Sequence, residues 1–225
     1  MIAPASLDAR RLPVKVCCIQ DHDEAALAVR CGAASVGLVS RMPSGWGPIP
    51  DEAIAEIARR VPPFVVTMLL SSHTEPRALI AQQRQVRCRA IQIVDAFPED
   101  GYPALREALP GVTLFKVVHV TGPEALDEAR RVAPLADGLI LDSGGGSGET
   151  RVLGGTGLTH DWSISAQIVA SVQAPVLLAG GLKPHNVAEA IRTVAPHGLD
   201  LCTGVRIDHR LDEALLRAFL AAAVA

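Results

Sequence analysis

Eight short apolar runs recur along the chain and alternate with amphipathic segments. The runs are rich in Val, Ile and Leu and are almost continuously hydrophobic, which is typical of parallel strands covered on both faces. They occupy residues 14–19, 34–40, 64–70, 89–94, 113–120, 137–142, 174–180 and 198–204. The segments between most of them repeat apolar residues with a helical period, and several begin with Asp, Thr or Pro, as helices commonly do.

Alternation of this kind in 225 residues is compatible with two α/β architectures, the closed (β/α)8 TIM barrel and the open doubly wound sheet. The number of runs favours the barrel. Because 49% of the residues are hydrophobic, the chain can bury a sizeable core without dividing into several domains. We therefore expect a single TIM-barrel domain over residues 1–225, with residues 1–13 as a poorly ordered N-terminal extension.

Charge and composition exclude several classes of partner. The formal net charge is −3 and no long basic run is present, which argues against a nucleic-acid partner. No window approaches the roughly 18 apolar residues of a membrane span, and the N-terminus lacks a signal-peptide stretch, so no membrane partner is expected. The five cysteines form no C-x-x-C pair, as in a cytoplasmic protein with reduced thiols. The apolar C-terminal segment packs on the barrel or on a second subunit, which leaves a monomer or a homodimer.

A TIM barrel carries its active site at the carboxyl ends of its strands, so the polar residues that follow the runs are the candidates. These are Cys17, Cys18, Ser40, Arg41, Ser71, Ser72, Asp95, His119, Asp142, Gly180, Gly181, Thr203 and Gly204. No grouping of His, Cys and carboxylate residues has the spacing of metal ligands, and we expect neither a metal site nor a cofactor.

Glycine-rich turns follow the last three runs and predict a phosphate site. Phosphate commonly binds to the loops after strands 7 and 8 of such barrels, where backbone N–H groups point at the anion. The candidate phosphate-binding residues are Gly155, Thr156, Gly157, Gly180, Gly181, Thr203 and Gly204. Plain strand-to-helix turns are the alternative interpretation of Gly180 and Gly181. The preceding "SGGGSGE" at 143–149 is expected to be a mobile lid.

Five segments, in order along the chain, carry a resemblance to a known family. They are "KVCCI" (15–19), "GLILD" (138–142), "GGTGLTHDW" (154–162), "LAGGLKPHNVAEAI" (178–191) and "LDLCTGV" (199–205). Together they resemble the motifs of phosphoribosylanthranilate isomerases, the barrel enzymes of tryptophan biosynthesis. The resemblance covers essentially the whole chain after residue 13, and it implies a phosphorylated sugar as substrate.

The resemblance also implies a reaction, the Amadori rearrangement of an N-linked phosphoribosyl arylamine, without a metal or redox cofactor. One group protonates the ribose ring oxygen and another removes a proton from the neighbouring carbon. Matched to the family motifs, Cys17 is the general base and Asp142 is the general acid. From the residues alone, a buried structural cysteine and a turn or capping aspartate are the alternatives. Lys15 shares the face of Cys17 and is either its charge partner or a residue one layer deeper.

The chain departs from the family pattern around the expected aryl pocket. Where the family has Ser-Pro-Arg, this chain has Ser44, Gly45 and Trp46, so the arginine implied to hold the substrate carboxylate is replaced by a neutral indole. Arg41 lies in the same loop and would substitute. The other departures are Cys18 in place of Gly, Val94 in place of His, and Arg206 in place of an acidic residue.

The expected substrate pocket is made of Lys15, Arg41, Trp46, Gln92 and His119, although a histidine at a strand end, such as His119, is as often structural. Three functions fit this combination of kept and lost residues. The first is phosphoribosylanthranilate isomerase, and the second is a related isomerase acting on a different phosphorylated sugar or amine. The third is a non-catalytic phosphosugar-binding barrel, which has no need to keep both Cys17 and Asp142.

Overall fold

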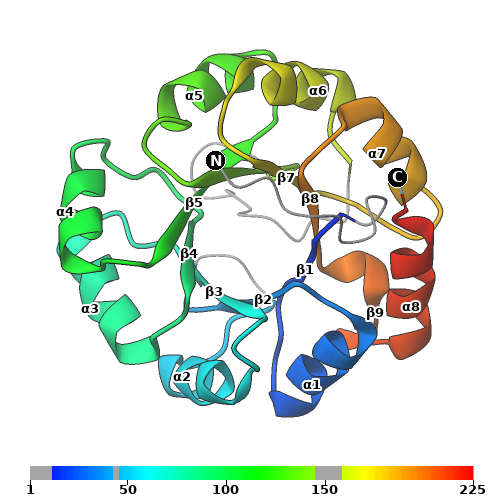
Figure 1. Ribbon diagram of the computed structural model, residues 1–225, viewed down its shortest axis with the longest axis horizontal. Helices are drawn as coiled ribbons and strands as arrows, with labels where there is room; N and C mark the ends of the chain where they lie inside the picture. The colour runs from blue at the N-terminus through cyan, green and yellow to red at the C-terminus, as the bar shows by residue number, and fades with distance from the viewer. Residues whose placement is uncertain (1–11, 43–45, 145–158, 225) are drawn as a thin grey trace.

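The computed structural model describes residues 12–42, 46–144 and 159–224. Eight parallel strands close into one barrel in the order of the sequence, because β8 pairs with β1 (Figure 1). The strands are β1 (Val14–Val16), β2 (Ser35–Val39), β3 (Val66–Ser71), β4 (Ala90–Ile93), β5 (Thr113–His119), β6 (Gly138–Asp142), β7 (Val176–Leu178) and β8 (Gly198–Leu201). Each predicted run coincides with one strand, and the TIM-barrel prediction is confirmed.

In the described part of the chain, eight α-helices surround the barrel (Figure 1). They are α1 (His22–Cys31), α2 (Asp51–Arg60), α3 (Pro76–Val86), α4 (Gly101–Ala108), α5 (Glu124–Val132), α6 (Trp162–Ser171), α7 (Val187–Val194) and α8 (Glu213–Ala222). The helical pattern of α4 is hard to recognise because Gly101 and Pro103 lie in its first turn, where proline is tolerated since the first N–H groups have no helical partner. Among the described residues, no helix is both long enough and apolar enough to span a membrane.

Strand alternation divides the core into two apolar layers. Residues that point outward from the strands, such as Val16 and Leu199, pack with the inner faces of the helices. Residues that point inward fill the barrel lumen and include Cys17, Val39, Met68, Leu70, Ala90, Val94, Val117, Ile140 and Ala179. The side chains of lumen residues near the carboxyl ends of the strands are therefore held at the mouth of the barrel.

The chain after β8 forms a turn and a small hairpin that the sequence does not predict. A 3-10 turn, η2 (Thr203–Val205), leads into a small hairpin of β9 (Arg206–Ile207) and β10 (Arg210–Leu211). The two turn residues, Asp208 and His209, have φ angles of 47° and 66°, the left-handed pair that fits a tight hairpin. This hairpin returns Arg206 to the carboxyl end of β1.

Two sequence expectations fall largely outside the described residues. Of the expected N-terminal extension, residues 1–11 lie outside, while the Pro13 carbonyl accepts a hydrogen bond from Leu199 N (2.9 Å) and so lies on the barrel. Of the expected lid, only Ser143 and Gly144 are described.

Candidate active site

A buried ion pair joins the first and last strands of the barrel. The register sets Lys15 of β1 opposite Asp200 of β8, and Lys15 Nζ lies 2.7 Å from Asp200 Oδ2. Burial alone would lower the pKa of Lys15, but the negative charges of Asp200 and Cys17 raise it above its usual value. Burial raises the pKa of Asp200 to about 7 against the opposing effect of Lys15. The Lys15 ammonium thus interacts electrostatically with both Asp200 and Cys17.

Cys17 is the next lumen-facing residue along β1, and Lys15 lies one layer deeper on the same face. Their side-chain ends meet over Gly37 of β2, where an added Cβ would lie 2.8 Å from Cys17 Sγ and 3.0 Å from Lys15 Nζ. Lys15 is therefore both the deeper residue and the charge partner. A hydrogen bond from the Cys18 thiol, together with the charge of Lys15, lowers the pKa of Cys17 to about 5 against the effect of burial. Cys17 is a thiolate at neutral pH.

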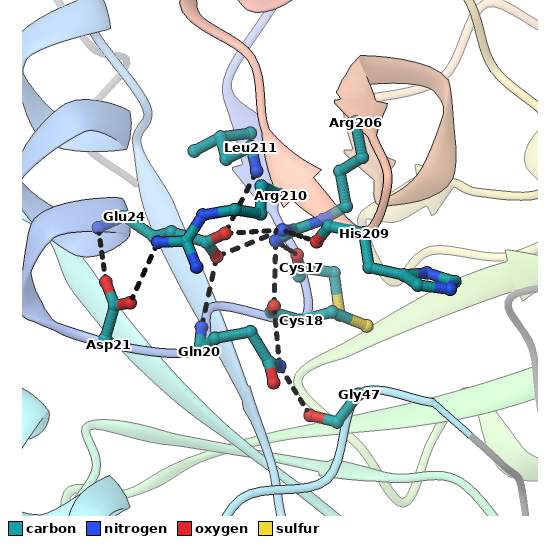
Figure 2. A network of polar contacts seen from close by, with 10 residues as sticks. All are labelled: Cys17, Cys18, Gln20, Asp21, Glu24, Gly47, Arg206, His209, Arg210 and Leu211. Carbon is teal, nitrogen blue, oxygen red and sulfur yellow. Dashed lines mark hydrogen bonds and ion pairs between the residues drawn. The ribbon is translucent and has the colours of Figure 1, made fainter.

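A second network of polar contacts holds the backbone that carries the thiolate (Figure 2). Arg206 Nη2 donates to the carbonyls of Cys17 (3.0 Å) and Cys18 (2.7 Å). Arg206 Nη1 donates to both carboxylate oxygens of Glu24, and the two side chains are only 3% and 6% exposed. Because Glu24 neutralises the charge of Arg206, we interpret Arg206 as a residue that holds the backbone at the end of β1 and not as a cation that binds a ligand.

Cys18 has a φ of 59°, the left-handed conformation that favours glycine. The family pattern has glycine at this position, and this chain places a cysteine side chain there in the left-handed conformation. Gln20 Nε2 and Arg206 Nη2 both donate to the Cys18 carbonyl, so two hydrogen bonds stabilise the strained residue.

A second part of the mouth is built by β5 and β6, which carry His119 and Asp142. Register pairs His119 with Asp142, and both side chains share the inward face of Val117 and Ile140. Asp142 is half-buried and its Oδ1 accepts a hydrogen bond from Ser143 N (2.7 Å). His119 Nε2 lies 3.2 Å from the Val94 carbonyl. Strands β7 and β8 separate β6 from β1, so Asp142 and Cys17 reach the mouth from different sides.

The loops after β7 and β8 meet at the same mouth. Gly180 and Gly181 have φ angles of 86° and 62°, and a Cβ on Gly180 would lie 2.8 Å from Ser143 N. A Cβ on Gly204 would clash with the Leu182 carbonyl. The turn after β7 therefore needs glycine at position 180 for both conformation and close approach, and the turn after β8 needs glycine at position 204 for close approach. Thr203 lies beside Gly204 in η2, whereas Gly155, Thr156 and Gly157 lie outside the described residues.

The remaining predicted pocket residues divide between lumen and rim. Gln92 is buried in the lumen on β4, and within the described part of the chain its Oε1 has no hydrogen-bond partner. Trp46 stacks on His209 with ring centroids 4.8 Å apart, and Arg206 Cζ lies 5.0 Å from the Trp46 ring centroid. Arg41 is exposed just beyond the end of β2. The hairpin of β9 and β10 thus holds Trp46 through His209 and Arg206.

Sequence reasoning missed two parts of this arrangement. It offered no role for Asp200, whose pairing with Lys15 follows from barrel register, and it counted Arg206 only as a departure. Glu24 and Arg206 are far apart in the chain and no sequence signal links them, although a Glu in the first turn of α1 is an ordinary helix-start residue. Among the described residues, no group of three or more His, Cys, Asp or Glu side chains has a geometry that holds a metal ion.

Comparisons with known proteins agree with this geometry. The family model described as N-(5'phosphoribosyl)anthranilate (PRA) isomerase matches residues 14–222. The N-(5'-phosphoribosyl)anthranilate isomerase of Haloferax volcanii is 38% identical, with 93% of this chain and 92% of the relative covered. That of Methanocella arvoryzae is 33% identical, with 92% and 95% covered.

Solved structures extend the likeness to three dimensions. The phosphoribosyl anthranilate isomerase of Thermus thermophilus superposes with a TM-score of 0.79 at 26% identity, covering 94% of this chain and 98% of that one. A phosphoribosyl anthranilate isomerase in complex with reduced 1-(o-carboxyphenylamino)-1-deoxyribulose 5-phosphate superposes with a TM-score of 0.78 at 25% identity and the same coverage. With matching motifs, barrel and family model, this chain belongs to the N-(5'-phosphoribosyl)anthranilate isomerase family.

Proposed function

We propose that this chain isomerises N-(5'-phosphoribosyl)anthranilate to 1-(o-carboxyphenylamino)-1-deoxyribulose 5-phosphate, with Cys17 as general base and Asp142 as general acid. One observation carries the assignment: the Cys17 sulfur lies against the Lys15 ammonium inside the barrel mouth, where a pKa of about 5 keeps it ready to accept a proton. A purely structural buried cysteine has no need of a buried cation.

The chemistry needs a proton delivered on one side of the sugar and removed on the other. Asp142 protonates the ribose ring oxygen, and the ring opens to a Schiff base. Cys17 then takes the proton from the adjacent carbon, and the resulting enol tautomerises to the ketone. When Cys17 becomes neutral, Lys15 keeps Asp200 as its counter-ion, so the buried cation is never left unpaired.

The glycine turns are proposed to hold the phosphate of the sugar. Gly180, Gly181, Thr203 and Gly204 bring two loops together at the mouth, and backbone N–H groups there can approach an anion closely. Gly155, Thr156 and Gly157 are assigned to the same phosphate on the motif alone. A phosphate anchored on the β7 and β8 side places the ribose between Cys17 and Asp142.

The aryl end of the substrate is assigned to the rim around β2, β4 and β5. Arg41 is the exposed cation that replaces the missing family arginine, and Gln92 and His119 complete the pocket wall. A second candidate is an isomerase for a phosphorylated amine without the carboxylate. The stacking of Trp46 on His209 favours it, because the indole occupies the position from which the family arginine would reach.

We also propose the domain organisation, the cellular compartment and the assembly of this chain. We infer one TIM-barrel domain over residues 1–225, because α8 closes the ring of helices between α7 and α1. All five cysteines are free thiols, which supports a reducing compartment such as the cytoplasm. The assembly is a monomer or a homodimer.

The function is tested by following the loss of anthranilate fluorescence as purified protein turns over phosphoribosylanthranilate. We expect turnover by the unmodified chain and by Cys88→Ala, which removes a buried thiol at the far end of the barrel from Cys17. Binding of a sugar phosphate without turnover would overturn the proposal. Rescue of a tryptophan auxotroph that lacks the isomerase is the matching test in cells.

A further inference from the structure

Three thiols gather at the carboxyl ends of β1 and β8, and the proposed mechanism uses only one of them. Cys17, Cys18 and Cys202 belong to the same lumen cluster. The Cys18 thiol is hydrogen-bonded to both Cys17 and Cys202, so the three sulfurs form a continuous group. All three are free thiols in this structure.

Strand register brings Cys17 and Cys202 together independently of Cys18. Val16 pairs with Leu201, and Cys17 N donates to the Leu201 carbonyl (2.8 Å), so the ladder continues one step beyond the assigned strands. Cys17 and Cys202 then occupy neighbouring positions on adjacent strands, and both side chains point into the lumen. Neighbouring strands lie about 4.8 Å apart.

That spacing permits a disulfide between Cys17 and Cys202. A disulfide spans Cα atoms about 4.4–6.8 Å apart, which matches adjacent strands. Consecutive residues have Cα atoms only about 3.8 Å apart, so a bridge from Cys17 to Cys18 is disfavoured. A bridge from Cys18 to Cys202 would leave the reactive sulfur of Cys17 free.

Cys17 is also the thiol that an oxidant would attack first. Lys15 holds a positive charge against its sulfur, and thiolates react with peroxides faster than thiols do. Cys202 is only half-buried, so the pair lies at the open end of the lumen.

We propose that a peroxide converts Cys17 and Cys202 into a reversible disulfide that switches the enzyme off. The inference rests on the proposed role of Cys17 as general base. Hydrogen peroxide oxidises Cys17 to a sulfenic acid and is itself reduced to water. The Cys202 thiol then attacks the sulfenic sulfur, the S–S bond forms, and the hydroxyl group leaves as a second water. Two electrons pass from the two thiols to the peroxide, and a dithiol reductant returns them.

Cys202 then protects the active site as well as regulating it. A sulfenic acid with no partner proceeds to the sulfinic acid, which dithiols do not reduce. A disulfide stops that progression. The chain therefore pairs a reactive base with a resolving thiol on the next strand.

The test exposes the purified full chain to hydrogen peroxide and then to dithiothreitol, with peptide mapping and isomerase assay at each stage. The matched variants are Cys202→Ser, which removes the resolving thiol, and Cys31→Ser, which removes a remote thiol at the end of α1. We expect the untreated variants to keep the activity of the unmodified chain.

We expect the oxidised wild-type chain and Cys31→Ser to lose activity by about 100-fold, the contribution of a general base, and to regain it with dithiothreitol. Their maps contain the Cys17 peptide joined to the Cys202 peptide, with the loss of two hydrogens. Cys202→Ser loses activity without recovery, and its Cys17 peptide carries added oxygen.

Equal recovery of Cys202→Ser and the wild-type chain would overturn the proposal, as would a bridge that includes Cys18 or irreversible inactivation of the wild-type chain. Failure of the proposed function has a different signature. In that case the linked peptides form on oxidation, but the untreated chain has no isomerase activity.

Discussion

The two sides of the barrel mouth are built differently. On the β1 side, the proposed base Cys17 lies beside two buried ion pairs, Lys15 with Asp200 and Arg206 with Glu24. On the β6 side, the proposed acid Asp142 is half-buried beside His119 and Ser143. A thiol is mostly protonated at neutral pH, at an ordinary pKa of about 8.5, so it becomes a base only where its surroundings favour the thiolate. The two buried ion pairs therefore lie beside the residue whose proposed role requires a large pKa shift.

The largest effects are expected from removing the two reacting groups. Cys17→Ala and Asp142→Asn should each lower kcat by about 100- to 10,000-fold, the usual contribution of a general base or acid. KM should change little, because the residues proposed to hold the phosphate and aryl ends of the substrate remain. The fluorescence assay gives both constants. A variant that keeps more than a tenth of the wild-type kcat would remove its residue from the mechanism.

The next largest effect is expected on the free energy of unfolding, and it compares a buried ion pair with an exposed one. Arg206→Met leaves Glu24 charged and buried, which should lower the free energy of unfolding by about 3–5 kcal/mol. Arg106→Met breaks the exposed pair with Asp137 and should cost less than about 1 kcal/mol, because solvent screens that pair.

Urea denaturation of the two variants measures this difference. Adding Glu24→Gln to Arg206→Met should recover part of the loss, since the unpaired charge is then removed. Equal urea midpoints for the two single variants would mean that the buried Arg206–Glu24 pair adds no more to stability than the exposed pair does.

A smaller effect is expected at the phosphate turns. Gly180→Ala and Gly111→Ala both place a side chain at a positive φ, 86° and 82°, and each should cost about 1–2 kcal/mol of stability. Only at Gly180 would the new methyl press on Ser143, whereas the space around Gly111 is open. Gly180→Ala alone should therefore raise KM and weaken inhibition by inorganic phosphate. An equal rise for Gly111→Ala would contradict the phosphate assignment.

The smallest effect is expected at the rim. Arg41→Ala should raise KM for the anthranilate substrate by roughly tenfold, the value of one charge-assisted hydrogen bond, with kcat unchanged. The same substitution should not affect KM for the substrate analogue in which aniline, which lacks the carboxylate, replaces anthranilate. A similar KM rise for both substrates would assign Arg41 to something other than carboxylate recognition.

The sequence predicts the barrel, and it offers Cys17 and Asp142 as candidates, because both rest on local signals. Strands appear as apolar runs, and the two candidates lie near the carboxyl ends of such runs within short motifs. Helix α4 is less visible because glycine and proline in its first turn hide the helical period.

What the sequence does not reveal is contact between distant segments. Lys15 meets Asp200, and Arg206 meets Glu24, only when β8 closes on β1 and the hairpin after it turns back. The counter-ion of Lys15 and the contacts that hold the Cys17 backbone therefore come from tertiary structure, whereas Cys18 and Lys15, which lower the pKa of Cys17, are its neighbours in sequence. The same is true of Trp46, whose partner His209 comes from the other end of the chain.

The most direct test of the account is the pH dependence of kcat/KM, measured together with the ultraviolet absorbance of the thiolate. Because the pKa of Cys17 is lowered to about 5, the base is deprotonated above that pH, and the acidic limb of the kcat/KM profile should fall tenfold per pH unit below it. Lys15→Met removes the cation, so the same fall should begin at higher pH. A wild-type profile that loses activity already below about pH 8, where an ordinary thiol titrates, would contradict the claim that Lys15 and its neighbours hold Cys17 as a thiolate.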